Sequence, residues 1–142
     1  MYTEDVKQLF KSNNIKNTQQ RHMVYSILKS KKQPITTEEI YKIISGKLEK
    51  PINLSTVYRI LEVFTEKELI LKSQIHINGK ALYEINHREH RHHLICIKCN
   101  KIIPIKGCPL GEYEQILEKQ TGYKIIEHNL EIKGICPKCQ KR

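Results

Sequence analysis

The spacing of apolar residues divides the chain into a helical first half and a second half of short strands. In the first half, apolar side chains recur at intervals of three and four residues, which is the period of an amphipathic α-helix. We therefore predict a series of helices ending near residue 68. The apolar residues expected on their buried faces are Val6, Leu9, Phe10, Val24, Ile27, Leu28, Ile40, Ile43, Ile44, Leu48, Val57, Ile60, Leu61 and Phe64.

Residues that favour helix starts support this division. Thr3, Thr18 and Ser55 can each begin a helix, because a side-chain oxygen there accepts a hydrogen bond from a free backbone N–H group. Thr36 and Glu39 have the spacing of a capping box, in which two side chains satisfy each other's free backbone groups. These four starts predict four helices.

After Leu69 the pattern changes to strict alternation, which is typical of β-strands. Residues 70–77 and 81–85 flank Asn78-Gly79, a strong signal for a tight hairpin turn. Helices followed by a two-stranded hairpin form the outline of a winged helix-turn-helix domain, and we assign residues 1–86 to it.

Residues 87–142 are predicted to form a second, smaller domain. Short alternating segments at residues 90–97, 102–105 and 124–133 indicate strands, and residues 110–120 indicate one helix. The predicted fold class is therefore α+β, with an N-terminal winged helix-turn-helix domain followed by a small α/β domain.

Charge narrows the choice of partners. The 142 residues include 25 Lys and Arg against 15 Asp and Glu, a formal net charge of +10. This balance favours polyanions, with nucleic acid ahead of anionic membranes. No apolar run approaches the roughly 18–20 residues that span a bilayer, and the N-terminal residues lack the apolar core of a signal peptide. We therefore expect a cytoplasmic protein.

The fourth predicted helix has the composition of a DNA-reading helix. Its apolar face leaves Thr56, Tyr58 and Arg59 largely on the other side. Arg59 can pair with a phosphate or a guanine edge, and Tyr58 can touch a thymine methyl group or a phosphate. Lys16 and Arg21 could add phosphate or minor-groove contacts. The alternative is an ordinary solvated face; the preceding helix, the hairpin and the net charge favour DNA.

The cysteines predict a structural zinc site. Cys96 and Cys99 form one pair separated by two residues, and Cys136 and Cys139 form another. Two such pairs supply the tetrahedral four-sulfur set that zinc prefers, in a closed site without room for a substrate. The alternative is free or redox-active thiols. Cys108 stands apart, and its default interpretation is an inert buried thiol.

A run of histidines precedes the first cysteine pair. In a strand, neighbouring side chains point to opposite faces, so His90 and His92 share one face while Arg91 and His93 share the other. The run therefore predicts two separate sites rather than one cluster. Imidazole ligands suit zinc, iron, nickel or copper. A solvated or pH-sensitive polar strand is the alternative.

These motifs together resemble the ferric uptake regulator family of metal-responsive DNA-binding repressors, over nearly the whole chain. The stretches that carry the resemblance are IKNTQQR, TTEEIY, LSTVYRIL, ALYEI, HRHHLICIKCNKI and GYKIIEHNLEIKGICPKC. The resemblance implies a homodimer that binds a palindromic operator, a C-terminal dimerisation domain with a four-cysteine zinc site, and one or two further metal sites that couple dimer shape to DNA binding. The residues predicted to bind DNA are Lys16, Arg21, Ser55, Thr56, Tyr58 and Arg59.

The resemblance also implies where a second metal binds. His90, His92 and His128 match the family's site within the dimerisation domain. Gly111 occupies the position of the expected acid, so the adjacent Glu112 is taken as its substitute.

A sensing site between the domains is less complete. Its predicted ligands are His76, Glu84 and His93, of which Glu84 and His93 match family positions and His76, or else His87, could complete the set. Other ligand positions carry replacements, at Pro34, Arg91 and Pro104.

The replaced ligands disfavour a ferrous site, and the stretch IKGCPLGEYEQ resembles the zinc uptake regulator branch. We therefore predict a zinc-sensing repressor of metal uptake genes, with structural Zn²⁺ and a second regulatory divalent metal, Zn²⁺ ahead of Fe²⁺ or Mn²⁺. The alternatives are an iron- or peroxide-sensing regulator of the same family and, more remotely, a zinc storage or interaction module without sequence-specific DNA binding. No enzyme is expected, because no His-Glu-x-x-His helix is present and a thiol oxidoreductase needs only one cysteine pair.

Overall fold

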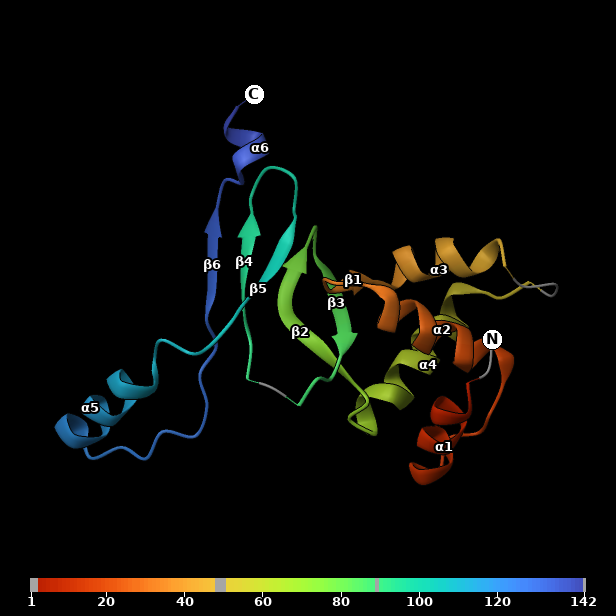
Figure 1. Ribbon diagram of the computed structural model, residues 1–142, viewed down its shortest axis with the longest axis horizontal. Helices are drawn as coiled ribbons and strands as arrows, with labels where there is room; N and C mark the ends of the chain where they lie inside the picture. The colour runs from red at the N-terminus through yellow and green to blue at the C-terminus, as the bar shows by residue number, and fades with distance from the viewer. Residues whose placement is uncertain (1–2, 48–50, 89, 142) are drawn as a thin grey trace. The chain divides into compact units, whose positions relative to one another are not determined.

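The computed structural model describes residues 3–47, 51–88 and 90–141 (Figure 1). Contacts along the chain divide it into two compact units, Met1–His87 and Arg88–Arg142. The predicted division between residues 86 and 87 lies one residue away from this boundary. Leu48, predicted on a buried helix face, falls outside the described residues. The predicted α+β class is confirmed.

Four helices make up most of the first unit: α1 (Glu4–Ser12), α2 (Gln19–Ser30), α3 (Thr37–Ser45) and α4 (Leu54–Glu66). The first three begin as predicted, because Thr3, Thr18 and Thr36 each accept a hydrogen bond from a backbone N–H group in the first turn. The start of α4 differs. Asn53 caps it instead of Ser55, since its Oδ1 atom accepts the Thr56 N–H at 2.9 Å.

A three-stranded antiparallel sheet of order β1-β3-β2 completes the first unit. Strands β2 (Ile70–Ile77) and β3 (Lys80–Ile85) form the predicted hairpin. Asn78 and Gly79 take positive φ values of 53° and 75°, the conformation that a tight turn of this kind requires. Strand β1 (Ile35–Thr36) was not predicted, because two residues are too few to show a period; it pairs Ile35 with Tyr83.

The core of the first unit is built around aromatic rings from three helices. Phe10 and Phe64 are fully buried, with ring centroids 5.5 Å apart, and Tyr25 packs edge-on against both. Val57 and Leu61 of α4 are also fully buried in this core. One face of α4 is thereby fixed against the other helices, which leaves the face that carries Tyr58 exposed.

The second unit has a sheet of order β5-β4-β6. Strand β4 (His92–Cys96) pairs antiparallel with β5 (Ile102–Ile105) and parallel with β6 (Glu131–Gly134). The predicted third strand, 124–133, is wrong over its first seven residues. The pairing of β6 with β4 begins at Glu131, which lies opposite His93. Because β4 itself begins at His92, the residues before Glu131 have no neighbouring strand to pair with.

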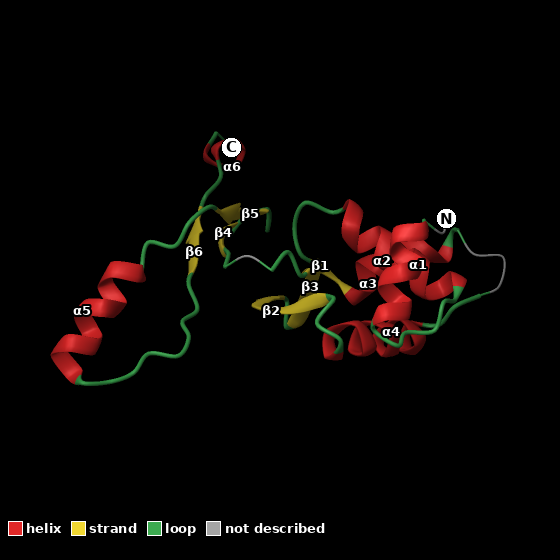
Figure 2. Cartoon of the chain, turned by 60° about the horizontal axis from the view of Figure 1, so that its bottom comes forward, coloured by secondary structure: helices red, strands yellow, loops and turns green. Residues whose placement is uncertain are grey.

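Two helices belong to this unit, α5 (Gly111–Thr121) and α6 (Pro137–Gln140). Long loops connect α5 to the strands on both sides, as Figure 2 shows. None of the residues of α5 is buried. No helix among the described residues is both long and apolar enough to cross a membrane.

Candidate metal centres and nucleic-acid interface

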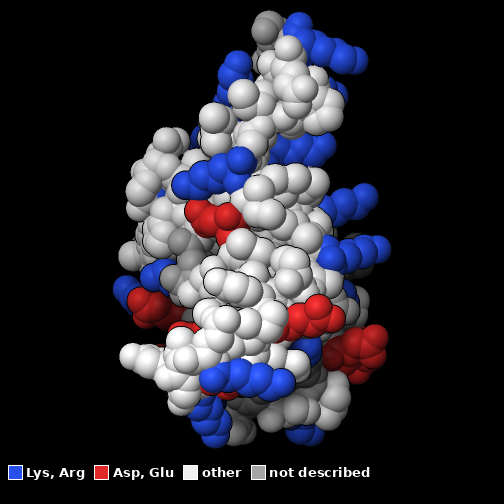
Figure 3. All heavy atoms as spheres, turned by 90° about the vertical axis from the view of Figure 1, so that its left-hand side faces the viewer, with Lys and Arg blue, Asp and Glu red and all other residues white. Residues whose placement is uncertain are grey.

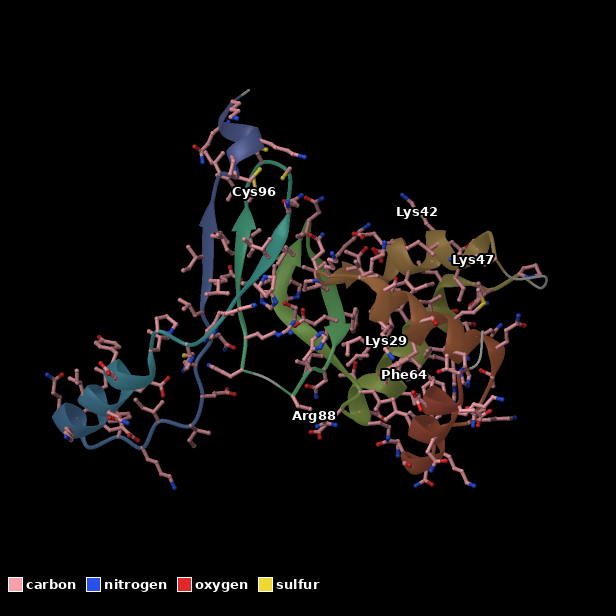
Figure 4. All side chains as sticks on the ribbon, viewed as in Figure 1. Lys29, Lys42, Lys47, Phe64, Arg88 and Cys96 are labelled. Atoms are coloured by element: carbon pink, nitrogen blue, oxygen red, sulfur yellow. The ribbon has the colours of Figure 1, made fainter. Side chains whose placement is uncertain are left out.

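The four paired cysteines come together at one end of the second sheet (Figure 4, around Cys96). Cys96 ends β4, Cys99 follows it in a turn, and Cys136 and Cys139 lie at the cap and within the single turn of α6. Their four Sγ atoms lie within 4.8 Å of one another, and the cysteines are not joined by disulfides. The group is the one predicted from the two spacings.

The electrostatics of this group favour a cation when all four sulfurs are deprotonated. Hydrogen bonds from the backbone N–H groups of Cys136 and Cys99 lower the pKa of Cys96 to about 6. The hydrogen bond with Cys136 raises the pKa of Cys139 to about 12, because neighbouring sulfurs cannot all carry a negative charge at this distance. Four thiolates therefore form together only around a positive ion.

The spacing of the sulfurs fits zinc. A tetrahedral ion with Zn–S bonds of about 2.3 Å separates its sulfurs by about 3.8 Å. The Sγ atoms of Cys99 and Cys136 lie 3.8 Å apart. Cys96 and Cys139 are buried, so the group is closed on one side by the protein itself. We refer to these four residues as the cysteine cage.

A second group of ligands lies at the other end of β4. It contains His90, His92, Cys108 and His128, which each offer a ligand atom within 4.8 Å of the others. The Nε2 atom of His128 lies 2.8 Å from that of His90 and 3.0 Å from that of His92. The Cys108 Sγ atom lies 3.2 Å from His128 Nε2 and 3.4 Å from His92 Nε2. We call these four residues the histidine–cysteine group.

The arrangement of the histidine–cysteine group fits a bound ion. A neutral imidazole nitrogen that carries no proton can only accept, so three Nε2 atoms facing one point need a proton or a cation between them. Burial, followed by the nearby His90 and His128, lowers the pKa of His92, which keeps this imidazole in the neutral form that metals bind. Three nitrogens and one sulfur are four donor atoms of the types that zinc prefers.

The acid beside this group is Glu114 rather than Glu112. Glu114 Oε1 contacts His128 Nδ1, so the Nδ1 proton is held by the carboxylate and the Nε2 lone pair is left for a metal. Glu112 is exposed in the first turn of α5 and is not part of either ligand group. Two residues along a helix differ in direction by about 200°, so these two acids project from different sides of α5.

The sequence prediction missed the role of Cys108 in this arrangement. Cys108 is half-buried in the loop before α5 and lies against two imidazoles, so it is not an isolated core thiol. The sequence did contain a signal for Cys108, namely the Cys-Pro pair just before a predicted helix. Only the folded loop brings that sulfur to histidines 16 and 20 residues away.

The residues predicted to form a site between the domains lie in separate units. His76 and Glu84 lie on β2 and β3 of the first unit, and His93 lies on β4 of the second. His87 precedes the boundary and is exposed. Their role as ligands stays a prediction.

Four of the six predicted DNA-facing residues lie at the start of α4 or on its exposed face. Asn53 Oδ1 accepts hydrogen bonds from the Ser55 and Thr56 hydroxyl groups, both at 2.8 Å. Tyr58 and Arg59 are exposed on the next turn. Lys16 and Arg21 lie beside the start of α2, where Arg21 Nη1 donates to the Lys16 carbonyl oxygen at 3.4 Å.

Basic side chains are spread over one face of the protein rather than gathered in one block. On the face seen in Figure 3, lysine and arginine side chains are scattered among uncharged ones. This face therefore offers no continuous basic patch.

A winged helix-turn-helix unit joined to a unit with two metal-ligand groups defines the class of protein: a metal-binding protein with a DNA-binding type of fold. Comparison with known families agrees with this class. The chain belongs to the ferric uptake regulator family, whose model matches residues 12–133.

Curated relatives cover nearly the full length of the chain. The peroxide operon regulator of Bacillus subtilis is 31% identical over 139 residues, 98% of this chain and 94% of the relative. The ferric uptake regulation protein of Helicobacter pylori is 31% identical over 138 residues, 97% of this chain and 91% of the relative. These relatives are transcriptional regulators and not enzymes, as predicted.

Solved structures share the fold. The Helicobacter pylori ferric uptake regulator, described as having three functional metal-binding sites, superposes with a TM-score of 0.79 at 31% identity and covers 96% of this chain and 90% of its own. A zinc-bound manganese uptake regulator superposes with a TM-score of 0.73 at 25% identity and covers 92% of this chain and 97% of its own.

Proposed function

We propose that this protein is a zinc-sensing transcriptional repressor of metal uptake genes, which acts in the cytoplasm as a homodimer on a palindromic operator. The observation that carries the proposal is the histidine–cysteine group. It forms a second ligand set, separate from the cysteine cage, in a chain that also has a winged helix-turn-helix unit.

The choice of zinc rests on the donor atoms. Imidazole and thiolate ligands suit zinc, whereas carboxylate and water suit Mn²⁺. In the histidine–cysteine group the acid Glu114 contacts an imidazole and does not occupy a ligand position. An iron- or peroxide-sensing role is the second candidate, favoured by the similarity to the Bacillus subtilis peroxide operon regulator.

The proposal of a homodimer rests on apolar surface in the second unit. Large apolar side chains are exposed on its strands, on α5 and in its loops, and α5 buries none of its residues. An apolar depression of about 210 Å³ lies beside the cysteine cage, between β4, β5 and the end of β6. Exposed apolar surface of this kind is typical of a protein–protein interface. A second copy of this chain is the partner that matches the symmetry of a palindromic operator. The exposed residues are Ile97, Ile103, Tyr113, Ile116, Tyr123, Ile126, Ile132 and Ile135.

The two ligand groups have different tasks in this proposal. The cage residues hold the C-terminal turn on β4 and keep a closed site. The histidine–cysteine residues come from the start of β4 and from the loops on both sides of α5, so holding them together restricts both loops. When bound, the ion supplies the positive charge that lets Cys108 be present as a thiolate.

Operator binding then depends on how the second unit is ordered. Two recognition helices α4 of a dimer must meet successive major grooves about 34 Å apart. Restricting the loops around α5 would limit the spacing that the two helices adopt. A metal bound by His76, Glu84 and His93 would add to this by restricting the connection between the units. Lys16, Arg21 and Arg59 would contribute contacts to phosphates, and the exposed face of α4 would read base edges.

A DNA-binding titration tests this function. Protein with a zinc-filled cage is titrated with Zn²⁺, Fe²⁺ or Mn²⁺ at buffered free concentrations, with a duplex selected from a random library as the target. We expect Zn²⁺ to raise affinity about 5- to 150-fold, the range of typical allosteric coupling.

The variants H128A and C108S should lose this response to Zn²⁺ while they keep the cage zinc, which elemental analysis checks. Equal binding by metal-loaded and metal-depleted protein would contradict the proposal. A response to Fe²⁺ with none to Zn²⁺ would favour the iron- or peroxide-sensing alternative.

A further inference from the structure

The side chain of Glu38 connects three elements of the first unit. It lies in the first turn of α3. The Tyr58 hydroxyl group on α4 donates a hydrogen bond of 2.9 Å to Glu38 Oε1. Lys80 Nζ, at the start of β3 in the wing hairpin, lies 3.1 Å from Glu38 Oε2. One carboxylate therefore contacts both the recognition helix and the wing.

Burial and charge strengthen the contacts of Glu38 with Tyr58 and Lys80. The Glu38 side chain is 26% exposed, against 54% for Lys80, and its Oε2 atom is shielded from solvent. Desolvation alone would raise the pKa of Glu38, but hydrogen bonds from Lys80 and Tyr58 outweigh it and lower this pKa. The hydrogen bond to Glu38 also raises the pKa of Tyr58. The tyrosine therefore keeps its proton and the acceptor stays charged, which strengthens the hydrogen bond.

This hydrogen bond limits what Tyr58 can do on DNA. A phenol has one proton to donate, and here Glu38 accepts it, so the hydroxyl group cannot donate to a phosphate. Tyr58 as a whole residue is 42% exposed, so its ring remains available for contact with DNA. A ring surface suits apolar contact with a thymine methyl group. The negative charge of Glu38 also opposes phosphate oxygens that approach Tyr58 or Lys80.

We propose that Glu38 is a positioning residue for sequence discrimination, which holds the Tyr58 ring against base edges and restrains Lys80 from sequence-independent phosphate contact. The inference rests on the proposed function, because it requires α4 to enter DNA. Glu38 is an acidic residue outside the predicted DNA-binding set. In this inference it favours binding to the specific sequence over binding to other DNA.

The variants of the test separate this role from simple charge or stability. E38A removes both contacts, and E38Q keeps an oxygen acceptor for Tyr58 without the charge. Glu62, an exposed acid one helical turn after Tyr58 on α4, provides the matched control E62A, because it removes the same charge from the same helix without touching that hydroxyl group. E38S repeats the comparison if E38A does not fold, since serine cannot reach Tyr58 and is tolerated at a helix start.

The measurement uses full-length, zinc-loaded protein. Affinity is measured for the duplex that wild-type protein selects from a random library, and for a scrambled duplex of the same composition, at two salt concentrations. Each thymine of the selected duplex is also replaced in turn by deoxyuridine, which lacks only the methyl group.

We expect E38A to lower the ratio of selected to scrambled affinity about tenfold, the size of a lost hydrogen bond to a charged group. E38Q should retain most of the ratio, and E62A should strengthen binding to both duplexes by the same factor. Deoxyuridine at the thymine that Tyr58 contacts should weaken wild-type binding and not that of E38A. In the Y58F background, E38A should lower the ratio less than it does in the wild-type background, because only the contact with Lys80 is then left to lose.

An equal ratio in E38A and wild type, or an unchanged deoxyuridine effect in E38A, would overturn this inference while the proposed function stands. Failure of the wild-type protein to select any sequence would overturn the proposed function, and this inference with it.

Discussion

At the scale of single residues, the contact between Glu114 and His128 decides which imidazole nitrogen of His128 faces the other members of the histidine–cysteine group. The imidazole has two nitrogens, and a carboxylate beside Nδ1 holds the proton there. Nε2 then presents its lone pair to the other members of the histidine–cysteine group. Carboxylates that orient a metal-binding histidine in this way tune affinity without touching the ion.

Replacing Glu114 with alanine should weaken Zn²⁺ binding at the histidine–cysteine group by about 10- to 100-fold, because the tautomer and ring orientation of His128 are no longer held. Competition with a chelator of known affinity measures the change, and cage zinc should be unaffected. E112A is the matched control on the same helix. A loss in E112A with none in E114A would show that the sequence-based choice of Glu112 was right.

At the scale of elements, the start of α4 depends on a cap that lies outside the predicted helix. Asn53 accepts one backbone N–H group and two hydroxyl groups through a single oxygen. The cap therefore orders Ser55 and Thr56, two residues of the predicted DNA-binding set, as well as the helix. Stability and DNA binding are connected at this position.

The variant N53A should lower the free energy of unfolding by about 0.5–2 kcal/mol, the usual cost of a lost N-terminal cap. Urea unfolding of the zinc-loaded protein measures the change. N53D should keep the stability, because aspartate offers the same acceptor, and S55A should cost less than N53A. Equal stability of N53A and wild type would show that the Ser55 hydroxyl group takes over the cap.

At the scale of the whole molecule, each of the two units is stabilised by different interactions. The first unit has a continuous apolar core in which Phe10, Val24 and Phe64 are fully buried. In the described part of the second unit, the buried residues are few: His92, Ile95, Cys96, Ile102 and Cys139. Two of the five belong to the cage and one to the histidine–cysteine group. So small an apolar core is typical of domains that bound metal or a partner subunit stabilises, which agrees with the proposed metal sites and homodimer.

The variant C139S should therefore unfold the second unit selectively. We expect loss of cage zinc and loss of amide-exchange protection across β4, β5 and β6, while α1, α2 and α4 keep their protection because their core contains no metal ligand. Exchange measured by mass spectrometry gives both answers in one experiment. C108S, which alters the other group, should leave the cage and the β4–β6 pairing in place. Loss of protection in both units together would contradict this division.

Features that depend on neighbouring residues were predictable from the sequence. The helices followed from the spacing of residues such as Val57, Ile60 and Leu61, and the hairpin followed from Asn78-Gly79. The cysteine cage was predictable for a chemical reason: two pairs with the same short spacing can satisfy one zinc ion wherever the fold brings them together.

Features that depend on a distant partner were decided by the tertiary structure alone. Strand β1 forms only because β3 offers an edge, and Cys108 becomes a candidate ligand only where its loop meets His92 and His128. The choice of Glu114 over Glu112 depends on the direction in which α5 presents each side chain. A local pattern defines a period and a set of chemical groups, but it contains no information on which loop returns to which strand. That is why the sequence by itself predicted the main helices, the hairpin and the grouping of the four cysteines, and the fold decided the neighbours of His128 and Tyr58.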